Sequence, residues 1–242
     1  MATQNTGRYS IESVGTALEL LEAFCEEEGE LCITHLAQRL GLTKSRVFRL
    51  LATFEQKGYV KKSTSQGKYN IGISAFETSR KLLTRMDLLS KARPVMDALA
   101  RECSESIYLA IPSGDDILLL EIANTDQQVQ VIPLVGRRYP ITDIAAGSVI
   151  FAHMTSGRTL SGEWATSRDQ GFCLDQDKLA KGVTSIAAPI FNEQNQAIGS
   201  LCLIGPTFRL TEEKIKEFHI SHIKNATSLI SAKLGCLTEE YL

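Results

Sequence analysis

Residues 43–60, TKSRVFRLLATFEQKGYV, decide the fold of the first part of this chain. Val47, Leu50, Leu51 and Phe54 follow the i, i+3, i+4, i+7 spacing of a helix with one buried stripe. Thr43 is a favourable residue to cap its start. The stretch therefore predicts an amphipathic helix whose outward side and edges are basic, with one aromatic residue and small residues: Lys44, Ser45, Arg46, Phe48 and Arg49.

The segments on either side complete a winged helix-turn-helix. Thr34 is predicted to cap the start of a short helix that ends at Gly41, which suits a left-handed terminal residue. An earlier helix has apolar residues spaced for burial at Val14, Ala17, Leu18, Leu21 and Phe24. The acidic stretch 26–30, EEEGE, is expected to be its solvated exit loop. Residues 59–72, with STSQG between YVKK and KYNIG, predict a β-hairpin, the wing.

Charge is concentrated on this predicted unit. The chain has 242 residues and a formal net charge of -2. From Arg39 to Lys68, however, eight bases accompany one acid, Glu55. A basic patch on a mildly acidic body indicates a polyanion bound by one end of the molecule.

The predicted winged helix-turn-helix indicates that the polyanion is DNA. The second helix of the turn enters the major groove, where Arg and Lys meet guanine and where Ser45 and Phe48 suit a base edge or a thymine methyl group. Lysines of the wing meet phosphates. The candidate DNA-binding residues are Thr34, Thr43, Lys44, Ser45, Arg46, Phe48 and Arg49, with Lys61, Lys62 and Lys68 on the wing. An exposed basic helix is often only a solvated face, but three adjacent elements agree here.

The rest of the chain predicts a second, α+β domain. Residues 74–104 are helical in pattern and divided near Asp87 and Pro94, so residues 74–90 are predicted to form a linker helix after a DNA-binding domain at residues 1–73. Its apolar residues predict pairing in a homodimer: Leu82, Leu83, Met86 and Leu89. Within residues 91–242, short apolar runs at 106–111, 117–123, 129–135, 185–191 and 197–205 predict an antiparallel sheet, and Thr211 caps a final helix.

Several other classes of protein are disfavoured. The strongest apolar run, residues 117–123, is too short to cross a membrane and contains Glu121, and no secretory signal is visible, so a cytoplasmic protein is expected. Six scattered cysteines fit reduced thiols better than disulfides or zinc. His219 and His222 have a metal-compatible spacing without a recognisable acidic partner, and Cys202 lies in an apolar run. No cofactor is expected. An enzyme fused to a DNA-binding domain, and a constitutive DNA-binding protein with a structural second domain, stay open as alternatives.

The sequence resembles the IclR-type regulators, named for the isocitrate lyase regulator. The resemblance runs in order through SVGTALELLEAF (13–24), residues 33–60, GRRYP (136–140) and residues 171–211. It implies a winged-helix DNA-binding domain, a dimerising linker helix, a GAF-like effector domain and a homodimer or dimer of dimers on a DNA operator. The chain departs from the family at Ser148, where a lysine is usual, and in the short connection from Met154 to Gln170.

The resemblance also implies a site for a small-molecule effector, an organic or aromatic acid. In the family such ligands lie at the start of the helix after GRxP, where backbone N–H groups favour a carboxylate. Asp175 would repel an anion unless it is protonated, bonds a ligand hydroxyl or points away. The implied effector-binding residues are Tyr139, Ala145, Ala146, Asp175, Val183, Ser185, Cys202 and Ile204.

Overall fold

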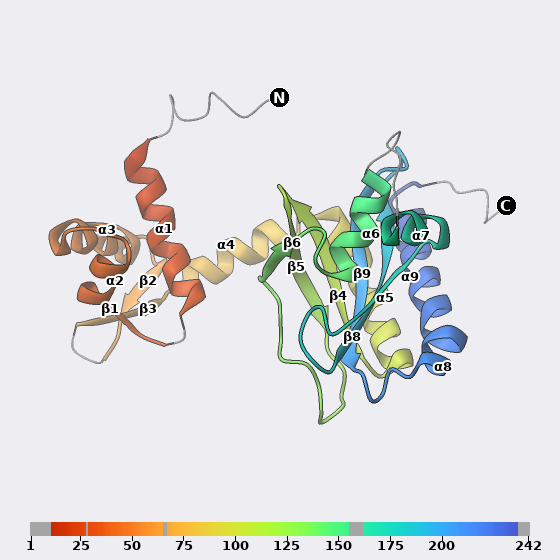
Figure 1. Ribbon diagram of the computed structural model, residues 1–242. Helices are drawn as coiled ribbons and strands as arrows, with labels where there is room; N and C mark the ends of the chain where they lie inside the picture. The colour runs from red at the N-terminus through yellow and green to blue at the C-terminus, as the bar shows by residue number, and fades with distance from the viewer. Residues whose placement is uncertain (1–10, 28, 65–66, 155–161, 237–242) are drawn as a thin grey trace. The chain divides into compact units, whose positions relative to one another are not determined.

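The computed structural model describes residues 11–27, 29–64, 67–154 and 162–236. It divides into two compact units, Met1–Leu83 and Thr84–Leu242 (Figure 1). In the described residues no helix is long and apolar enough to cross a membrane.

Unit 1 is a winged helix-turn-helix, which confirms the predicted fold. Its elements are α1 (Glu12–Glu26), β1 (Leu31–Cys32), α2 (Ile33–Arg39), α3 (Lys44–Gln56), β2 (Val60–Lys62), β3 (Lys68–Ile71) and α4 (Ile73–Leu83). The antiparallel sheet has the order β1-β3-β2, so the predicted wing gains a short third strand from the start of the helix-turn-helix. Tyr69 of β3 is buried in the core of this unit with Val47 and Leu51 of α3.

Two local predictions in unit 1 are wrong. Val14 and Leu18 of α1 are 53% and 54% exposed, because Leu20, Ala23 and Phe24 set the buried face. Leu18 is two residues from Leu20, about 200° around the helix, and therefore points away from the core. Helix α2 begins two residues early, at Ile33 with Cys32 at the cap position, so Thr34 lies inside its first turn and does not cap it. Thr43 does cap α3, accepting the Arg46 backbone N–H at 3.3 Å.

Unit 2 is an antiparallel sheet with helices on both faces, which confirms the α+β class. It contains α5 (Asp87–Cys103), β4 (Ser106–Ser113), β5 (Asp116–Ala123), β6 (Arg138–Pro140), α6 (Ala145–Met154), α7 (Glu163–Gln170), β7 (Cys173–Gln176), β8 (Val183–Phe191), β9 (Ala197–Pro206), α8 (Glu212–Lys214), the π-helical turn η2 (Ile215–His219) and α9 (Ile220–Lys233). The strand order is β6-β5-β4-β9-β8-β7. Helix α6 packs on one face, and α5 and α9 pack on the other (Figure 1).

The helical region after the wing, which consists of α4 and α5, breaks once in the described chain. Residues 84–86 separate α4 from α5, just before Asp87 as predicted. The second predicted division is wrong, because Pro94 lies inside α5. Pro94 and Ser90 are both exposed, so water can satisfy the Ser90 carbonyl that proline leaves without a helical N–H.

The apolar run 129–135 is a loop and not a strand. Pro133 has no N–H to give to a sheet ladder, which argues against a strand through this segment. Leu134 is buried, whereas Val129 and Ile132 are 57% and 64% exposed. The strand that pairs with the outer edge of β5 is instead β6, where Tyr139 lies opposite Ile117.

Candidate nucleic-acid interface and buried ligand site

Helix α3 presents one outward face made of the predicted DNA-binding residues. Val47 and Leu51 are fully buried and fix the inner face of the helix. Phe48 is 51% exposed, which is unusual for a large aromatic side chain without a partner surface. The structure brings together the remaining exposed residues of this face: Thr43, Lys44, Ser45 and Arg49. In the part of unit 1 that the structure describes, neither Lys44 nor Arg49 has a carboxylate partner.

Arg46 differs from these residues because it is bound to α1. Its Nη2 donates to Glu12 Oε1 at 3.0 Å and to Thr16 Oγ1 at 3.4 Å. The Arg46 side chain is 42% exposed. Its guanidinium is therefore held over α1 by residues far away in sequence, a contact that the helical spacing of residues 43–60 does not predict.

The wing carries three lysines that are not equivalent. Lys61, Lys62 and Lys68 are all exposed on β2 and β3. Lys62 Nζ lies 3.1 Å from Glu55 Oε2, and this hydrogen-bonded ion pair raises the pKa of Lys62. Glu55, the one acid of the basic stretch, is thus paired with a wing lysine. Thr34 is exposed on α2.

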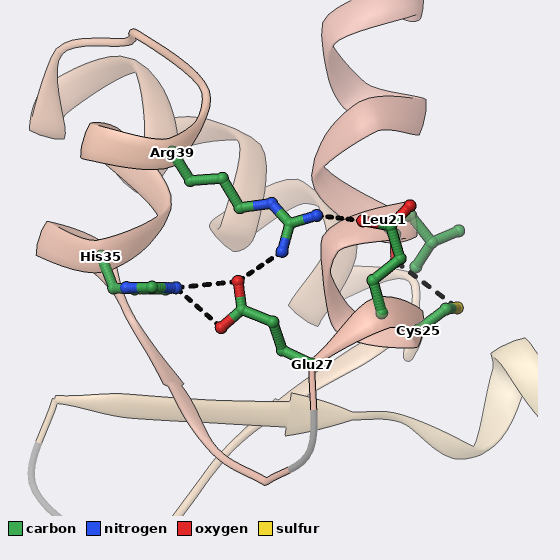
Figure 2. Close-up of polar contacts among 6 residues, drawn as sticks. Leu21, Cys25, Glu27, His35 and Arg39 are labelled. Carbon is green, nitrogen blue, oxygen red and sulfur yellow. Dashed lines mark hydrogen bonds and ion pairs between the residues drawn. The ribbon is translucent and has the colours of Figure 1, made fainter.

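The acidic exit of α1 is tied to α2, contrary to the prediction of a solvated loop. Figure 2 shows Arg39 bonded to Glu27, and the guanidinium also bonds Glu26. His35 Nε2 lies 2.7 Å from Glu27 Oε2, and the bonds from His35 and then Arg39 lower the pKa of Glu27. Glu30 accepts from Asn70 Nδ2 at 3.1 Å. Arg39 therefore does not add a free charge to the basic patch, whereas these ion pairs fix the approach of α1 to α2.

The predicted effector residues meet around the start of α6. Asp175 of β7, only 3% exposed, accepts the Ala145 backbone N–H on Oδ2 at 2.5 Å and the Ser185 hydroxyl on Oδ1 at 2.5 Å. Antiparallel pairing of β7 with β8 sets Asp175 opposite Ser185. Burial raises the pKa of Asp175, and the bonds from Ser185 and Ala145 oppose that rise. A protein carboxylate thus occupies the helix end that was expected to attract an anionic ligand.

The apolar members of the predicted site belong to one buried cluster. Ala145 and Ala146 pack there with Val183, Cys202 and Ile204, and Tyr139 covers them from β6. Burial raises the pKa of the Cys202 thiol well above its ordinary value, so the sulfur stays a neutral, apolar group. Ser148 is also buried and donates to the Thr142 carbonyl at 3.0 Å. Of the short connection from Met154 to Gln170, residues 155–161 lie outside the described residues.

Sequence reasoning missed Tyr108 in this cluster. The side chain is fully buried, lies opposite Cys202 in the β4–β9 pair and has a hydroxyl without a hydrogen-bond partner among the described residues. Burial raises its pKa to about 12, and the Leu134 backbone N–H, which lies near the hydroxyl but outside normal hydrogen-bond geometry, opposes the rise. The signal was a phenol inside the aliphatic run SIYLAI, because a buried Tyr hydroxyl normally requires a partner.

The structure offers no metal centre among the residues that it describes, since no three His, Cys, Asp or Glu side chains converge there. His222 donates from Nδ1 to the Phe218 carbonyl oxygen at 2.7 Å. Because a carbonyl oxygen only accepts, this nitrogen carries the proton. His219 is buried beside it.

Family models match most of the chain. The "IclR helix-turn-helix domain" matches residues 13–64, and "Bacterial transcriptional regulator IclR C-terminal" matches residues 80–161 and 154–232. The HTH-type transcriptional regulator KdgR of Escherichia coli K12 is 29% identical over 248 residues, covering 93% of this chain and 94% of that protein.

Solved structures share the fold. The IclR transcriptional regulator of Alicyclobacillus acidocaldarius aligns with a TM-score of 0.80 at 20% identity, covering 94% of this chain and 100% of that one. An IclR homolog of Microbacterium hydrocarbonoxydans, complexed with 4-hydroxybenzoate, aligns with a TM-score of 0.78 at 19% identity, covering 92% and 98%.

Proposed function

Because the chain belongs to the IclR family of DNA-binding transcriptional regulators, we propose that it binds an operator through α3 and that a small effector controls this binding. The observation that carries the first part is the outward face of α3. Lys44 and Arg49 lack carboxylate partners among the described residues, and Phe48 is half exposed beside them. Cations that are not used inside the protein are available to phosphates and base edges.

The proposed roles differ along this surface. Arg49 and Lys44 read base edges, with Ser45 and Phe48 beside them, while Lys61, Lys62 and Lys68 contact phosphates. Thr34 and Thr43 lie at the helix starts, where hydroxyl and backbone N–H groups suit phosphate oxygens. Arg46 contacts DNA only with the N–H groups that Glu12 and Thr16 leave free.

The proposed effector is an organic or aromatic acid held at the start of α6. Such an anion must take the Ala145 N–H from Asp175 or share a proton with that carboxylate, since two adjacent carboxylates repel each other. The raised pKa of Asp175 favours the shared proton. Tyr108 supports a polar ligand, because its buried hydroxyl has no partner in the described chain. The 4-hydroxybenzoate of the Microbacterium homolog is a suitable first probe.

The proposed domains are residues 1–73 for DNA binding, 74–90 as the linker and 91–242 for effector binding and assembly. The linker comprises α4 and the first residues of α5. No residue of α4 is buried, and Ile73, Phe76 and Leu82 are 69%, 57% and 61% exposed. Pairing of two chains along this helix, in a cytoplasmic homodimer or dimer of dimers, would cover these side chains. Leu89, which was also predicted to pair, is only 8% exposed because α5 packs it inside unit 2, so that part of the prediction is wrong.

Fluorescence anisotropy tests the DNA-binding proposal. The labelled DNA is a fragment that the full-length protein selects from a genomic library. Replacing Arg49 by Ala is expected to cost about 1 to 3 kcal/mol if it reads a base. Lys57→Ala, at the far end of α3, is the matched control. Wild-type affinity in a folded Lys44→Ala, Arg49→Ala double variant would reject the interface.

The effector proposal is tested separately with the same fragment. A set of organic and aromatic acids, including 4-hydroxybenzoate, is added to the complex and the change in affinity is measured. Binding matters only if it differs between the DNA-competent and DNA-incompetent states. An acid that shifts affinity in wild type but not in Ser185→Leu supports the site. If no small molecule changes affinity, the protein is the constitutive alternative.

A further inference from the structure

A cavity of about 350 Å³ in unit 2 lies where α5 ends and where α8 passes into η2. None of its lining residues belongs to α6 or β7, which carry Ala145 and Asp175, so it is separate from the proposed effector site. Its size is at the lower end of the range for small-molecule sites. The lining residues are Cys103, Ser104, Glu105, Gln127, Arg209, Lys214, Phe218 and His219.

The π-helical turn leaves the imidazole of His219 without a local partner. His153 and His222 each bond through Nδ1 to the carbonyl four residues earlier, at 2.8 and 2.7 Å. For His219 that carbonyl would be Ile215 O, but the turn directs the Ile220 N–H to it. His219 is 5% exposed, and its Nδ1 is buried with no hydrogen-bond partner in the described residues. Single π turns occur often at functional sites.

The charges around the cavity leave one cation uncompensated. Glu105, 3% exposed, is held by Arg209 through Nε to Oε1 at 2.6 Å and Nη2 to Oε2 at 2.8 Å. This pair is neutral as a unit, and Arg209 is further fixed by the Val129 carbonyl at 2.7 Å. Lys214 is exposed and has no carboxylate partner in the described part of the chain. The cavity therefore carries the formal charge of one lysine.

Of the remaining lining residues, Ser104 and Gln127 are polar and uncharged, and Cys103 and Phe218 supply the apolar part of the wall. Burial raises the pKa of the Cys103 thiol to about 12, so it is an uncharged group at neutral pH. Phe218 is 37% exposed and presents its ring between His219 and His222, with ring centroids 5.3 and 3.8 Å away. A ligand with one charge and an apolar body matches both the lysine and these walls.

We propose that this cavity is a second ligand site, for a small monocarboxylate. The carboxylate lies between Lys214 Nζ and His219, whose ring supplies an N–H, and the apolar body lies against Phe218 and Cys103. The Glu105–Arg209 pair forms the floor of the site. Arg209 does not bind the ligand carboxylate, because Glu105 already neutralises its charge. This inference stands independently of the effector site at α6.

Crystallography with para-bromobenzoate as the probe locates the site, and calorimetry with the same probe measures its affinity in solution. The expected bromine anomalous peak lies in the cavity beside Phe218. Lys214→Ala is expected to weaken this binding about tenfold, the loss of one hydrogen bond between charged groups. Lys216→Ala is the matched control, since Lys216 lies two residues after Lys214, is 67% exposed and pairs with Glu212.

Ser185→Ala separates this site from the proposed effector site. If the cavity binds the probe, Ser185→Ala retains the wild-type binding heat and affinity for para-bromobenzoate. Lys214→Ala and His219→Gln each weaken that binding. The proposal is overturned if no bromine peak appears in the cavity, or if Lys214→Ala and His219→Gln both retain wild-type affinity. It is also overturned if Ser185→Ala alone abolishes binding, because the probe then binds only at α6.

Discussion

The Ala145 backbone N–H donates to the buried Asp175 carboxylate at 2.5 Å, so a side chain from β7 caps the start of α6. The helix end thereby has its anion before any ligand arrives. The cap and the predicted effector position are the same place, which makes the protonation of Asp175 the property to measure first.

Asp175→Asn is expected to change how stability depends on pH. The folded-state pKa of Asp175 is raised above its ordinary 3.8, so the folded protein binds this proton more tightly than the unfolded chain does. The stabilisation of the folded state by this bound proton is complete below pH 3.8 and is lost as the pH rises through the pKa of Asp175 in the folded protein. The free energy of unfolding of wild type should therefore fall relative to Asp175→Asn across this window, by at most about 1.4 kcal/mol per pH unit.

Urea unfolding followed by fluorescence of Trp164, the one tryptophan of the chain, reports on unit 2. The exposed Asp115→Asn is the control variant. A constant difference between Asp175→Asn and wild type at every pH would show that the carboxyl is not perturbed.

Tyr108→Phe is expected to raise the free energy of unfolding of the ligand-free protein by about 1 kcal/mol, because it removes a buried hydroxyl without a partner. Ser200→Ala is the contrasting variant. Ser200 Oγ donates to the Ala146 carbonyl at 2.8 Å, so its loss is expected to cost about 1 kcal/mol. Equal destabilisation by the two changes, measured by Trp164 fluorescence, would mean that the Tyr108 hydroxyl is bonded.

Gly147→Ala is expected to destabilise unit 2 by about 3 kcal/mol, since an added Cβ would lie 2.2 Å from the Ile141 carbonyl oxygen and must push α6 away. Gly15→Ala in α1 has open space around the new methyl group and is expected to stabilise its helix by about 1 kcal/mol. Thermal unfolding by circular dichroism measures both. A tolerated Gly147→Ala would contradict the close approach of α6 to residue 141.

The wing lysines are expected to differ in the salt dependence of DNA binding. Lys61→Ala and Lys68→Ala should each lower the slope of log affinity against log salt by about 0.9 if each lysine meets one phosphate. Glu55→Gln frees Lys62 from its 3.1 Å ion pair and should strengthen binding at low salt. Anisotropy titrations at several KCl concentrations make the comparison. Slopes that stay parallel to wild type would remove the wing from the interface.

Local patterns in the sequence predicted much of unit 1. The spacing of Val47 and Leu51, and the cap at Thr43, are properties of neighbouring residues, and the structure confirms both. The burial of α1 was harder to predict, because Val14 and Leu18 are as apolar as Leu20 and only contacts with the rest of the unit decide between faces.

The polar contacts of the sites depend on residues far apart in sequence. Asp175 meets Ala145 because β7 forms the sheet edge next to β8, and Arg46 meets Glu12 because the first turn of α1 lies within reach of the first turn of α3. Neither pair has a spacing that periodicity can report. The π turn at Ile215–His219 is similar, since the residues around it read as an ordinary amphipathic helix.

The strand order β6-β5-β4-β9-β8-β7 determines when the sheet can be completed during translation. Strand β4 lies beside β9 at the centre of the sheet, although β5 to β8 are all translated between them. On the ribosome, the winged helix can fold while one edge of β4 is still unpaired, because β9 has not yet been synthesised. We expect the nascent chain to pass through a stage with a folded N-terminal unit and an incomplete sheet, the stage at which chaperones and premature strand pairing compete for it.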